Sequence, residues 1–183
     1  MQLIETPIKG VFEAASQPHD DDRGLFARLF CRETLAAAHN ERPIVQVNFS
    51  RTQSLGAIRG MHFQHPPKTE AKWIRCIRGH VFDVVIDLRY GSPTFFSWHA
   101  VELNAQRMNA VFIPEGCAHG FQVLEAGSEL LYLHSESYAP ESEGGVRHDD
   151  PRIGISWPLP ATDLSERDRS HALITETFQG IKL

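Results

Sequence analysis

The sequence of 183 residues predicts a mainly β fold, either a sandwich or a closed barrel of short strands. Short runs in which apolar and polar residues alternate recur along the chain, turn-forming residues separate them, and helix-forming stretches are sparse. No repeat, low-complexity tract or linker interrupts this pattern. We therefore expect a single domain over residues 1–183, a length sufficient to bury one core.

The clearest pair of strands is a hairpin from Ile74 to Leu88, with its turn at Arg78-Gly79. The strand after the turn alternates strictly, so one of its faces is wholly apolar and the other carries carboxylates. The apolar face holds Phe82, Val84, Ile86 and Leu88, and the other face holds Val81, Asp83, Val85 and Asp87.

Further strands follow from the same pattern, and helix is expected at only two places. The expected strands are Val45 to Ser50, Trp98 to Leu103, Ala110 to Ile113, Gly120 to Leu124 and Glu129 to Ser135. Turns are expected at Tyr90-Gly91-Ser92-Pro93, Pro114-Glu115-Gly116 and Glu125-Ala126-Gly127. The expected helical segments are Glu33 to His39 and a short turn opened by Ser165.

Charge and composition exclude several classes of function. The formal net charge of −5 leaves no electrostatic footprint for nucleic acid or for an anionic membrane surface. No stretch approaches the roughly 20 apolar residues that span a bilayer, and the start has no positively charged leader, so we expect a cytoplasmic protein. Cys31, Cys76 and Cys117 lack C-x-x-C spacing, which argues against a disulfide framework or a zinc knuckle.

Two histidines lie in the most informative motifs. His62 ends the pattern Gly56-x5-His62, and His119 ends the pattern Pro114-x-Gly116-x2-His119. The double-motif barrels called cupins carry G-x5-H-x-H-x3-4-E-x6-G followed by P-x-G-x2-H. The sequence therefore predicts a barrel pocket with a histidine from each motif inside it.

The second motif is complete, whereas the first is broken in a way that removes metal ligands. Gln64 stands where the second histidine should be, and Lys68 or Thr69 stands where the carboxylate should be. His65 and Glu70 could in principle replace the missing ligands, but their spacing places them off the expected face of an extended strand. A catalytic metal normally needs three or more protein ligands, so we predict no catalytic metal at this site.

Further segments along nearly the whole chain match one family in their order and spacing. They are Asp22-Arg23-Gly24-Leu25-Phe26, Gln46-Val47-Asn48-Phe49-Ser50, Arg59-Gly60-Met61-His62-Phe63-Gln64, Lys72, Phe82-Asp83-Val84 through Asp87-Leu88-Arg89, Gly91-Ser92-Pro93-Thr94, Ile113 to Phe121, Tyr132, Tyr138-x-Pro140-Glu141, Asp149-Asp150-Pro151, Ile155-x-Trp157-Pro158 and Leu164-Ser165-x-x-Asp168. The chain resembles the dTDP-4-dehydrorhamnose 3,5-epimerases, which are metal-free cupin-fold enzymes of nucleotide-sugar biosynthesis. The resemblance implies a cupin-type jelly-roll barrel with short peripheral helices.

The resemblance also implies four catalytic residues. The hydrogens at C3 and C5 of a 4-keto-6-deoxy sugar both flank the ketone, so a positioned base can remove them. By resemblance His62 is that base, and Asp168 orients it and stabilises its imidazolium. Lys72 matches the group that stabilises the enolate oxygen, and Tyr132 matches the acid that returns a proton on the opposite face.

Each of the four also has a purely structural interpretation. His62 would then be a strand histidine with satisfied hydrogen bonds, and Tyr132 a core residue. Asp168 lies three residues after Ser165, as the carboxylate of a helix capping box does. Lys72 would lie at a strand edge with its ammonium group in water.

A second set matches residues that bind the substrate in the family. Arg23 and Arg59 match arginines that hold the diphosphate, and Arg167 matches a basic residue near the phosphates. Gln46, Asn48 and Glu143 match polar contacts to the sugar nucleotide. Tyr138 matches the ring that stacks on thymine, and His119 matches a residue of the pocket wall.

The chain departs from the family pattern at two positions outside the catalytic four. Arg28 stands where the family usually has a glutamate that contacts the nucleotide, so an acceptor has become a five-donor cation. We count Arg28 with the substrate-binding residues. His148 stands in place of a tryptophan or a tyrosine.

The sequence and its resemblance thus predict epimerisation of a dTDP-4-keto-6-deoxyhexose at C3 and C5, in deoxysugar biosynthesis, with no cofactor. Alternatives of the same class are an epimerase that acts at one centre or on another NDP-4-keto sugar. Alternatives of other classes are a metal-dependent cupin oxygenase and a non-catalytic sugar-binding cupin. The resemblance also implies a homodimer in which N-terminal strands within residues 1–50 reach across the partner, with Gln2 to Phe12 at the interface.

Overall fold

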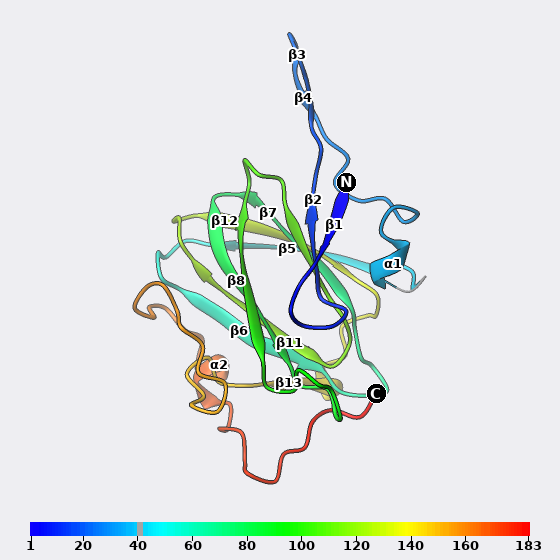
Figure 1. The fold of residues 1–183 in the computed structure, drawn as a ribbon. Coiled ribbons are helices and arrows are strands. Elements are labelled where there is room, and N and C mark those ends of the chain that lie inside the picture. The colour runs from blue at the N-terminus through cyan, green and yellow to red at the C-terminus, as the bar shows by residue number, and fades with distance from the viewer. Residues whose placement is uncertain (40–41) are drawn as a thin grey trace.

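The computed structural model describes residues 1–39 and 42–183, in which two antiparallel sheets pack against each other as a barrel (Figure 1). The first sheet has six strands in the order β1 (Gln2–Glu5), β2 (Phe12–Ala15), β10 (Ala110–Ile113), β7 (Lys72–Arg78), β12 (Ser128–His134) and β5 (Gln46–Thr52). The second sheet has five strands in the order β13 (Glu143–Gly145), β6 (Ile58–Gln64), β11 (Cys117–Val123), β8 (His80–Asp87) and β9 (Trp98–Asn104). The predicted mainly β class, a cupin-type jelly-roll barrel, is confirmed.

The remaining elements are short and peripheral, as expected. Strands β3 (His19–Asp21) and β4 (Gly24–Phe26) form a separate hairpin, and the helices are α1 (Ala36–His39), the 3₁₀ turn η1 (Pro140–Ser142) and α2 (Glu166–Ser170). Helix α1 begins later than the predicted Glu33, because the preceding residues form a turn in which Leu35 points fully into the core.

The predicted strands are confirmed with small shifts of their ends. The largest shift is in β11, which begins at Cys117 rather than at Gly120. Ala118 and His119 continue the antiparallel ladder opposite Ile86 and Val85 of β8, so the chain is already extended there. This extension places His119 on a strand inside the barrel rather than in the preceding turn.

Apolar clusters lie between the sheets and on the outer face of each. The central cluster includes Ile74, Val85, Phe121 and Leu130, which come from both sheets. The cluster outside the five-stranded sheet is covered by residues of the C-terminal segment, namely Ile153, Ile155, Trp157, Ile174, Phe178 and Ile181. The cluster outside the six-stranded sheet includes Leu35, Trp73 and Phe112.

Strand β8 is buried on both faces, and its two faces differ in what they contact. The apolar face of Val84, Ile86 and Leu88 packs into the outer cluster under the C-terminal segment. The face with the carboxylates points to the barrel interior, where Asp83 and Asp87 are both fully buried. Because carboxylates are rarely buried without partners, this face predicts specific polar contacts inside the barrel.

Strands β6 and β11 approach each other closely at the site of the two motif histidines. His62 and His119 are register partners, and the ladder is irregular between His119 and Phe121. A Cβ atom at Gly60, whose φ is +134°, would lie 2.4 Å from the Cα of Gly120. Glycine is therefore required at this crossing, which fixes the backbone next to His62.

The N-terminal part of the chain reaches away from the barrel. Figure 1 shows the β3–β4 hairpin projecting from the body beyond the N-terminus, and Leu25 and Phe26 on it are exposed. Across residues 1–39 and 42–183, no helix is long and apolar enough to cross a membrane.

Candidate active site

A cavity of about 480 Å³ opens between the two sheets. Most of the predicted site residues line it: Gln46, Asn48, Arg59, His62, Lys72, His119, Tyr132, Tyr138, Glu143 and Arg167. They come from strands β5, β6, β7, β11 and β12 and from the segments around η1 and α2. The barrel thus gathers residues that are far apart in the sequence into one polar pocket.

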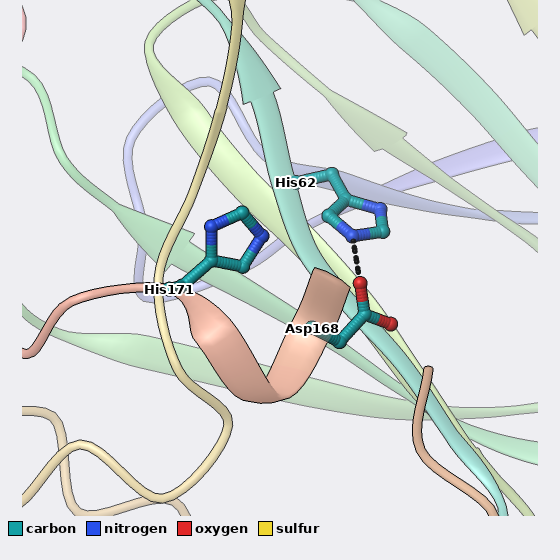
Figure 2. Close-up of side chains that lie close together, drawn as sticks. All are labelled: His62, Asp168 and His171. Carbon is teal, nitrogen blue, oxygen red and sulfur yellow. Dashed lines mark hydrogen bonds and ion pairs between the residues drawn. The ribbon is translucent and has the colours of Figure 1, made fainter. Parts of the chain in front are cut away.

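His62 is held by Asp168, which reaches the barrel from helix α2 (Figure 2). His62 Nε2 lies 2.8 Å from Asp168 Oδ1, and the Gly60 N–H donates to Asp168 Oδ2 at 3.3 Å. Burial raises the pKa of Asp168, but the hydrogen bond and charge of His62, together with the Gly60 N–H, outweigh it and lower that pKa to about 2. Asp168 is therefore an anion at neutral pH, aimed at the imidazole.

The capping interpretation of Asp168 accounts for its backbone and not for its carboxylate. Ser165 is the N-cap of α2, and its Oγ accepts a hydrogen bond from the Asp168 N–H at 3.0 Å. The carboxylate of Asp168 bonds to His62 and to the Gly60 N–H, and a capping box requires neither contact. The short helix therefore serves to position one buried carboxylate behind His62.

Lys72 lies in a buried network rather than with its ammonium group in water. The side chain is 6% exposed, and its Nζ lies 2.8 Å from Glu70 Oε1. Glu70 Oε2 lies 2.7 Å from His134 Nδ1, and His134 Nε2 lies 3.4 Å from Asn48 Nδ2. Burial opposes ionisation of Glu70, but the charge of Lys72 and the hydrogen bond to His134 lower its pKa to about 2.

Tyr132 contacts both the apolar core and the cavity. Its ring packs against the central apolar cluster, and its Oη lies 3.0 Å from Ser50 Oγ on the neighbouring strand β5. Burial raises the pKa of Tyr132 to about 12, so the phenol stays protonated at neutral pH.

His119 is paired with Asp83 more deeply in the barrel. His119 Nε2 lies 2.8 Å from Asp83 Oδ2, and both side chains are almost completely buried. Burial raises the pKa of Asp83 and lowers that of His119, because neither charged form is solvated there. This carboxylate comes from the interior face of β8.

The outer part of the cavity carries exposed polar and aromatic groups. Tyr138 is half-exposed, its Oη donates to Glu143 Oε2 at 3.1 Å, and its N–H donates to Gln46 Oε1 at 3.0 Å. Arg167 Nη1 donates to both Glu143 oxygens, at 2.9 and 3.0 Å, and Arg167 Nη2 lies 3.3 Å from His62 Nε2. Gln46 also donates to Asn48 at 3.1 Å, so these groups form one connected rim.

Three predicted site residues do not line this cavity: Asp168, which contacts it only through His62, and Arg23 and Arg28, which lie away from it. Arg23 lies in the β3–β4 turn, where its side chain is 89% exposed and pairs with Asp21. Arg28 lies in the exposed segment after that hairpin. Within one chain, neither contributes to the pocket around His62.

The sequence pattern missed several polar residues of the pocket. Glu70, Asp83 and His134 each pair with a predicted site residue or with each other, and Ser50 contacts Tyr132. Glu70 precedes Lys72 by two residues, and this spacing places both side chains on one face of an extended segment. The sequence alone could therefore have predicted that Glu70 pairs with Lys72. The pairings of Asp83 and His134 depend on which strands become neighbours.

The buried cysteines are unsuited to nucleophilic chemistry. Burial raises the pKa of Cys117 to about 12 and that of Cys76 to about 11, which keeps both thiols protonated. The active groups that this cavity offers are therefore imidazoles, carboxylates, a protonated phenol, an ammonium group and guanidinium groups. Together with the two-sheet barrel, they define a cupin-like protein with a polar acid–base pocket.

Comparison with known proteins identifies the family. The family model described as dTDP-4-dehydrorhamnose 3,5-epimerase matches residues 5–176. The chain is 39% identical to the dTDP-4-dehydrorhamnose 3,5-epimerase of Mycobacterium tuberculosis over 172 residues, covering 92% of this chain and 85% of the relative. It is also 39% identical to the dTDP-4-dehydrorhamnose 3-epimerase of Streptomyces niveus over 178 residues, covering 96% and 85%.

Solved structures agree with this assignment. The crystal structure of dTDP-6-deoxy-D-glucose-3,5-epimerase from Legionella pneumophila, in complex with dTDP-4-keto-L-rhamnose, superimposes with a TM-score of 0.89 at 36% identity, covering 94% of this chain and 92% of that chain. The chain belongs to the dTDP-4-dehydrorhamnose 3,5-epimerase family. It is accordingly an enzyme of the isomerase class.

Proposed function

We propose that this enzyme epimerises a dTDP-4-keto-6-deoxyhexose at C3 and C5 by removing and returning protons next to the ketone, as a step of deoxysugar biosynthesis. The observation that carries the proposal is the cavity itself. It holds an imidazole oriented by a buried carboxylate, a protonated phenol and a buried ammonium group. Acid–base chemistry next to a carbonyl needs a base, an acid and a group that stabilises the enolate oxygen.

His62 is the base in this proposal. When its Nε2–H donates to Asp168, Nδ1 carries the lone pair that accepts the proton from C3 or C5. The electrons of the broken C–H bond move into the C4 carbonyl, and the enolate oxygen that forms is stabilised by the Lys72 ammonium group. Asp168 stabilises the imidazolium that results.

Tyr132 is the acid that completes each epimerisation. Its phenol gives a proton to the carbon on the face opposite to His62, and the enolate returns to the ketone. The phenolate then takes a proton from water, and the imidazolium releases one, so the enzyme ends each cycle unchanged. The C3 and C5 steps use the same groups in turn.

The outer cavity provides the matching contacts for the nucleotide. In the proposal Arg59 and Arg167 hold the diphosphate, and Tyr138 stacks on the thymine ring. Gln46, Asn48 and Glu143 add polar contacts to the nucleotide and sugar, and His119 forms part of the wall beside the sugar. The proposal includes no cofactor, and the cytoplasmic location stays a prediction from the sequence.

The test is incubation of the purified enzyme with dTDP-4-keto-6-deoxyglucose in D₂O, followed by NMR of the sugar. Deuterium at both C3 and C5, with inverted configuration at both centres, is the expected result. A parallel incubation with the UDP-linked sugar shows whether the base pocket selects thymine. If no carbon acquires deuterium with any 4-keto nucleotide sugar, the proposed reaction is wrong.

A second candidate is epimerisation at C3 alone. It is favoured by the 3-epimerase of Streptomyces niveus, which is as similar to this chain as the 3,5-epimerase of Mycobacterium tuberculosis. The same NMR experiment separates the two candidates, because a 3-epimerase leaves the C5 hydrogen unexchanged. Family membership speaks against the oxygenase and the non-catalytic alternatives, since the family is one of isomerases.

We also infer a homodimer that brings Arg23 and Arg28 to a cavity. Strand β5 is an edge of the six-stranded sheet, and large apolar side chains are exposed on it and on the N-terminal arm. These are Leu25, Phe26, Leu29, Val45, Val47 and Phe49. Pairing of two chains would cover this surface and let each arm reach the partner.

The oligomeric state tests this inference. Light scattering after gel filtration should give twice the 20.6 kDa mass of the chain, and Phe49→Asp should shift the mass towards the monomer. Arg23→Ala should then raise the KM of the wild-type dimer without lowering kcat. A wild-type monomer with full activity would contradict the dimer and leave Arg23 outside the site.

A further inference from the structure

His171 is a third polar side chain beside the His62–Asp168 pair that the proposed reaction does not use. It follows helix α2 directly, and Figure 2 shows its ring turned towards His62. The two ring centroids lie 6.0 Å apart. Nε2 of His171 is buried and has no hydrogen-bond partner among the described residues. A buried nitrogen without a hydrogen-bond partner is energetically unfavourable, so a ligand that bound to it would remove this cost.

The three side chains have the composition of a metal site. One ligand atom from each of His62, Asp168 and His171 lies within 4.8 Å of the other two. Imidazole nitrogens and a carboxylate oxygen are established ligands of Zn²⁺, and three protein ligands with water in the fourth position complete a tetrahedron. We propose that His62, Asp168 and His171 form a binding site for a divalent transition metal ion, with Zn²⁺ as its type, and that metal binding inhibits the enzyme.

The geometry requires small movements to close around an ion. Ligand atoms about 2.1 Å from a tetrahedral Zn²⁺ lie about 3.4 Å from each other. His62 Nε2 and Asp168 Oδ1, now 2.8 Å apart, would therefore separate slightly, and His171 would move inward. Gly145 leaves the room for His171, because a Cβ there would lie 2.2 Å from His171 Nε2.

The charges around the cluster both favour and oppose a cation. Asp168 supplies one negative charge at the centre. Arg167 opposes the ion, since its Nη2 lies 3.3 Å from His62 Nε2 and its Nε lies 3.6 Å from Asp168 Oδ1. Glu143 holds Arg167 from the other side at 2.9 Å. Arg167 is half-exposed and can leave for solvent, so it acts as a competitor for the site rather than a permanent block.

Metal binding would stop the proposed reaction in a specific way. An ion on Nε2 of His62 replaces the hydrogen bond to Asp168 and leaves the proton on Nδ1, where the lone pair of the base should be. The inhibition therefore rests on the proposed role of His62. The binding itself does not, and it is measured without substrate.

The experiment is calorimetric titration of the full-length, chelator-treated protein with Zn²⁺, paired with the visible absorption of a Co²⁺ complex. The variants are His171→Asn, His62→Asn and Arg167→Ala. The control is His80→Asn, which removes another histidine paired with a carboxylate, 3.1 Å from Glu102.

We expect one site per chain and tetrahedral Co²⁺ bands. We expect at least tenfold weaker binding in the first two variants, several-fold tighter binding in Arg167→Ala, and no change in the control.

Activity gives an independent readout of the same site. His171→Asn should keep its metal-free activity and resist added Zn²⁺, whereas the wild type should lose activity as the site fills. Equal Zn²⁺ affinity in wild type and His171→Asn would overturn the proposal, as would an equal loss of affinity in the His80→Asn control. If Zn²⁺ binds as proposed but the wild type has no epimerase activity, the proposed function fails and the metal site stands.

Discussion

Two histidine–carboxylate pairs lie side by side in this barrel, and they differ mainly in their access to the cavity. His62 and His119 are register partners on β6 and β11, and each lies 2.8 Å from its carboxylate. The His62 side chain is 26% exposed, whereas that of His119 is 7% exposed. The carboxylate of the first pair has a lowered pKa and that of the second a raised one.

The difference shows that pairing alone does not make a base. Asp168 receives N–H groups from Gly60 and from His62, which stabilise its charge. Asp83 has one oxygen without a hydrogen-bond partner among the described residues, and burial disfavours its charged form. In the proposed reaction, the first pair therefore stabilises an imidazolium that faces the substrate, and the second pair forms a wall in which burial disfavours both charges.

The largest expected effect separates the two histidines by activity. His62→Asn should lower kcat by about 10³-fold, because removal of a positioned base typically costs 10²- to 10⁴-fold. His119→Asn should act mainly on KM, since in the proposed complex its ring forms the wall beside the sugar. Both values come from steady-state kinetics on variants with wild-type circular dichroism. Equal losses of kcat in the two variants would contradict the division of roles.

The next effect tests what Asp168 does for His62. Asp168→Asn keeps the shape of the side chain but removes the charge that stabilises the imidazolium, so kcat should fall by about 10²-fold. Asp83→Asn is the matched change in the buried pair and should leave kcat close to the wild-type value, as measured by steady-state kinetics. An equal fall of kcat in the two variants would contradict a specific role of the Asp168 charge.

Loss of Asp83 should lower the free energy of unfolding more than loss of Asp168, the reverse of their expected effects on kcat. Asp83→Ala leaves His119 buried without its partner, which costs about 1–3 kcal/mol of the free energy of unfolding. Asp168→Ala leaves His62 next to the open cavity, where water can replace the lost bond, so it should cost less than about 1 kcal/mol. Urea unfolding of both variants measures the difference. A larger loss in Asp168→Ala would show that the cavity pair also anchors helix α2.

The same two pairs show how far the sequence alone can lead. The motif with His62 and the alternation of β8 were sufficient to predict the barrel, a histidine in its cavity and the presence of carboxylates on one strand face, whereas the role of His62 as base came from the family resemblance. Alternation separates the two faces of a strand but does not say which one turns inward when both are buried. Asp83 was therefore visible in the pattern, but its pairing with His119 was not.

Other parts of the site depend on contacts that no local pattern encodes. Asp168 lies far along the chain from His62 and was recognised only through family resemblance, because a short capped helix looks the same with or without a partner for its carboxylate. Glu70 meets His134 only because β7 and β12 are neighbours in the sheet. In the proposed dimer, Arg23 and Arg28 reach a cavity of the partner, and no pattern within one chain predicts that contact.

The last expected effect extends the comparison to a third pair, Glu70 and His134, and it is measurable only in acid. The pKa of Glu70 is lowered to about 2 from 4.5, so its ionised form contributes stability above pH 4.5 that is lost as the pH falls towards 2. Glu70→Gln should flatten this acid loss by about 1–3 kcal/mol, as followed by thermal unfolding between pH 5 and about pH 2. Glu141→Gln, an exposed carboxylate near the same cavity, is the control and should follow the wild type. If Glu70→Gln loses stability in acid as steeply as the wild type, the charge of Glu70 does not hold Lys72 and His134 in place. The acid sensitivity of the barrel would then arise from the Asp168 pair.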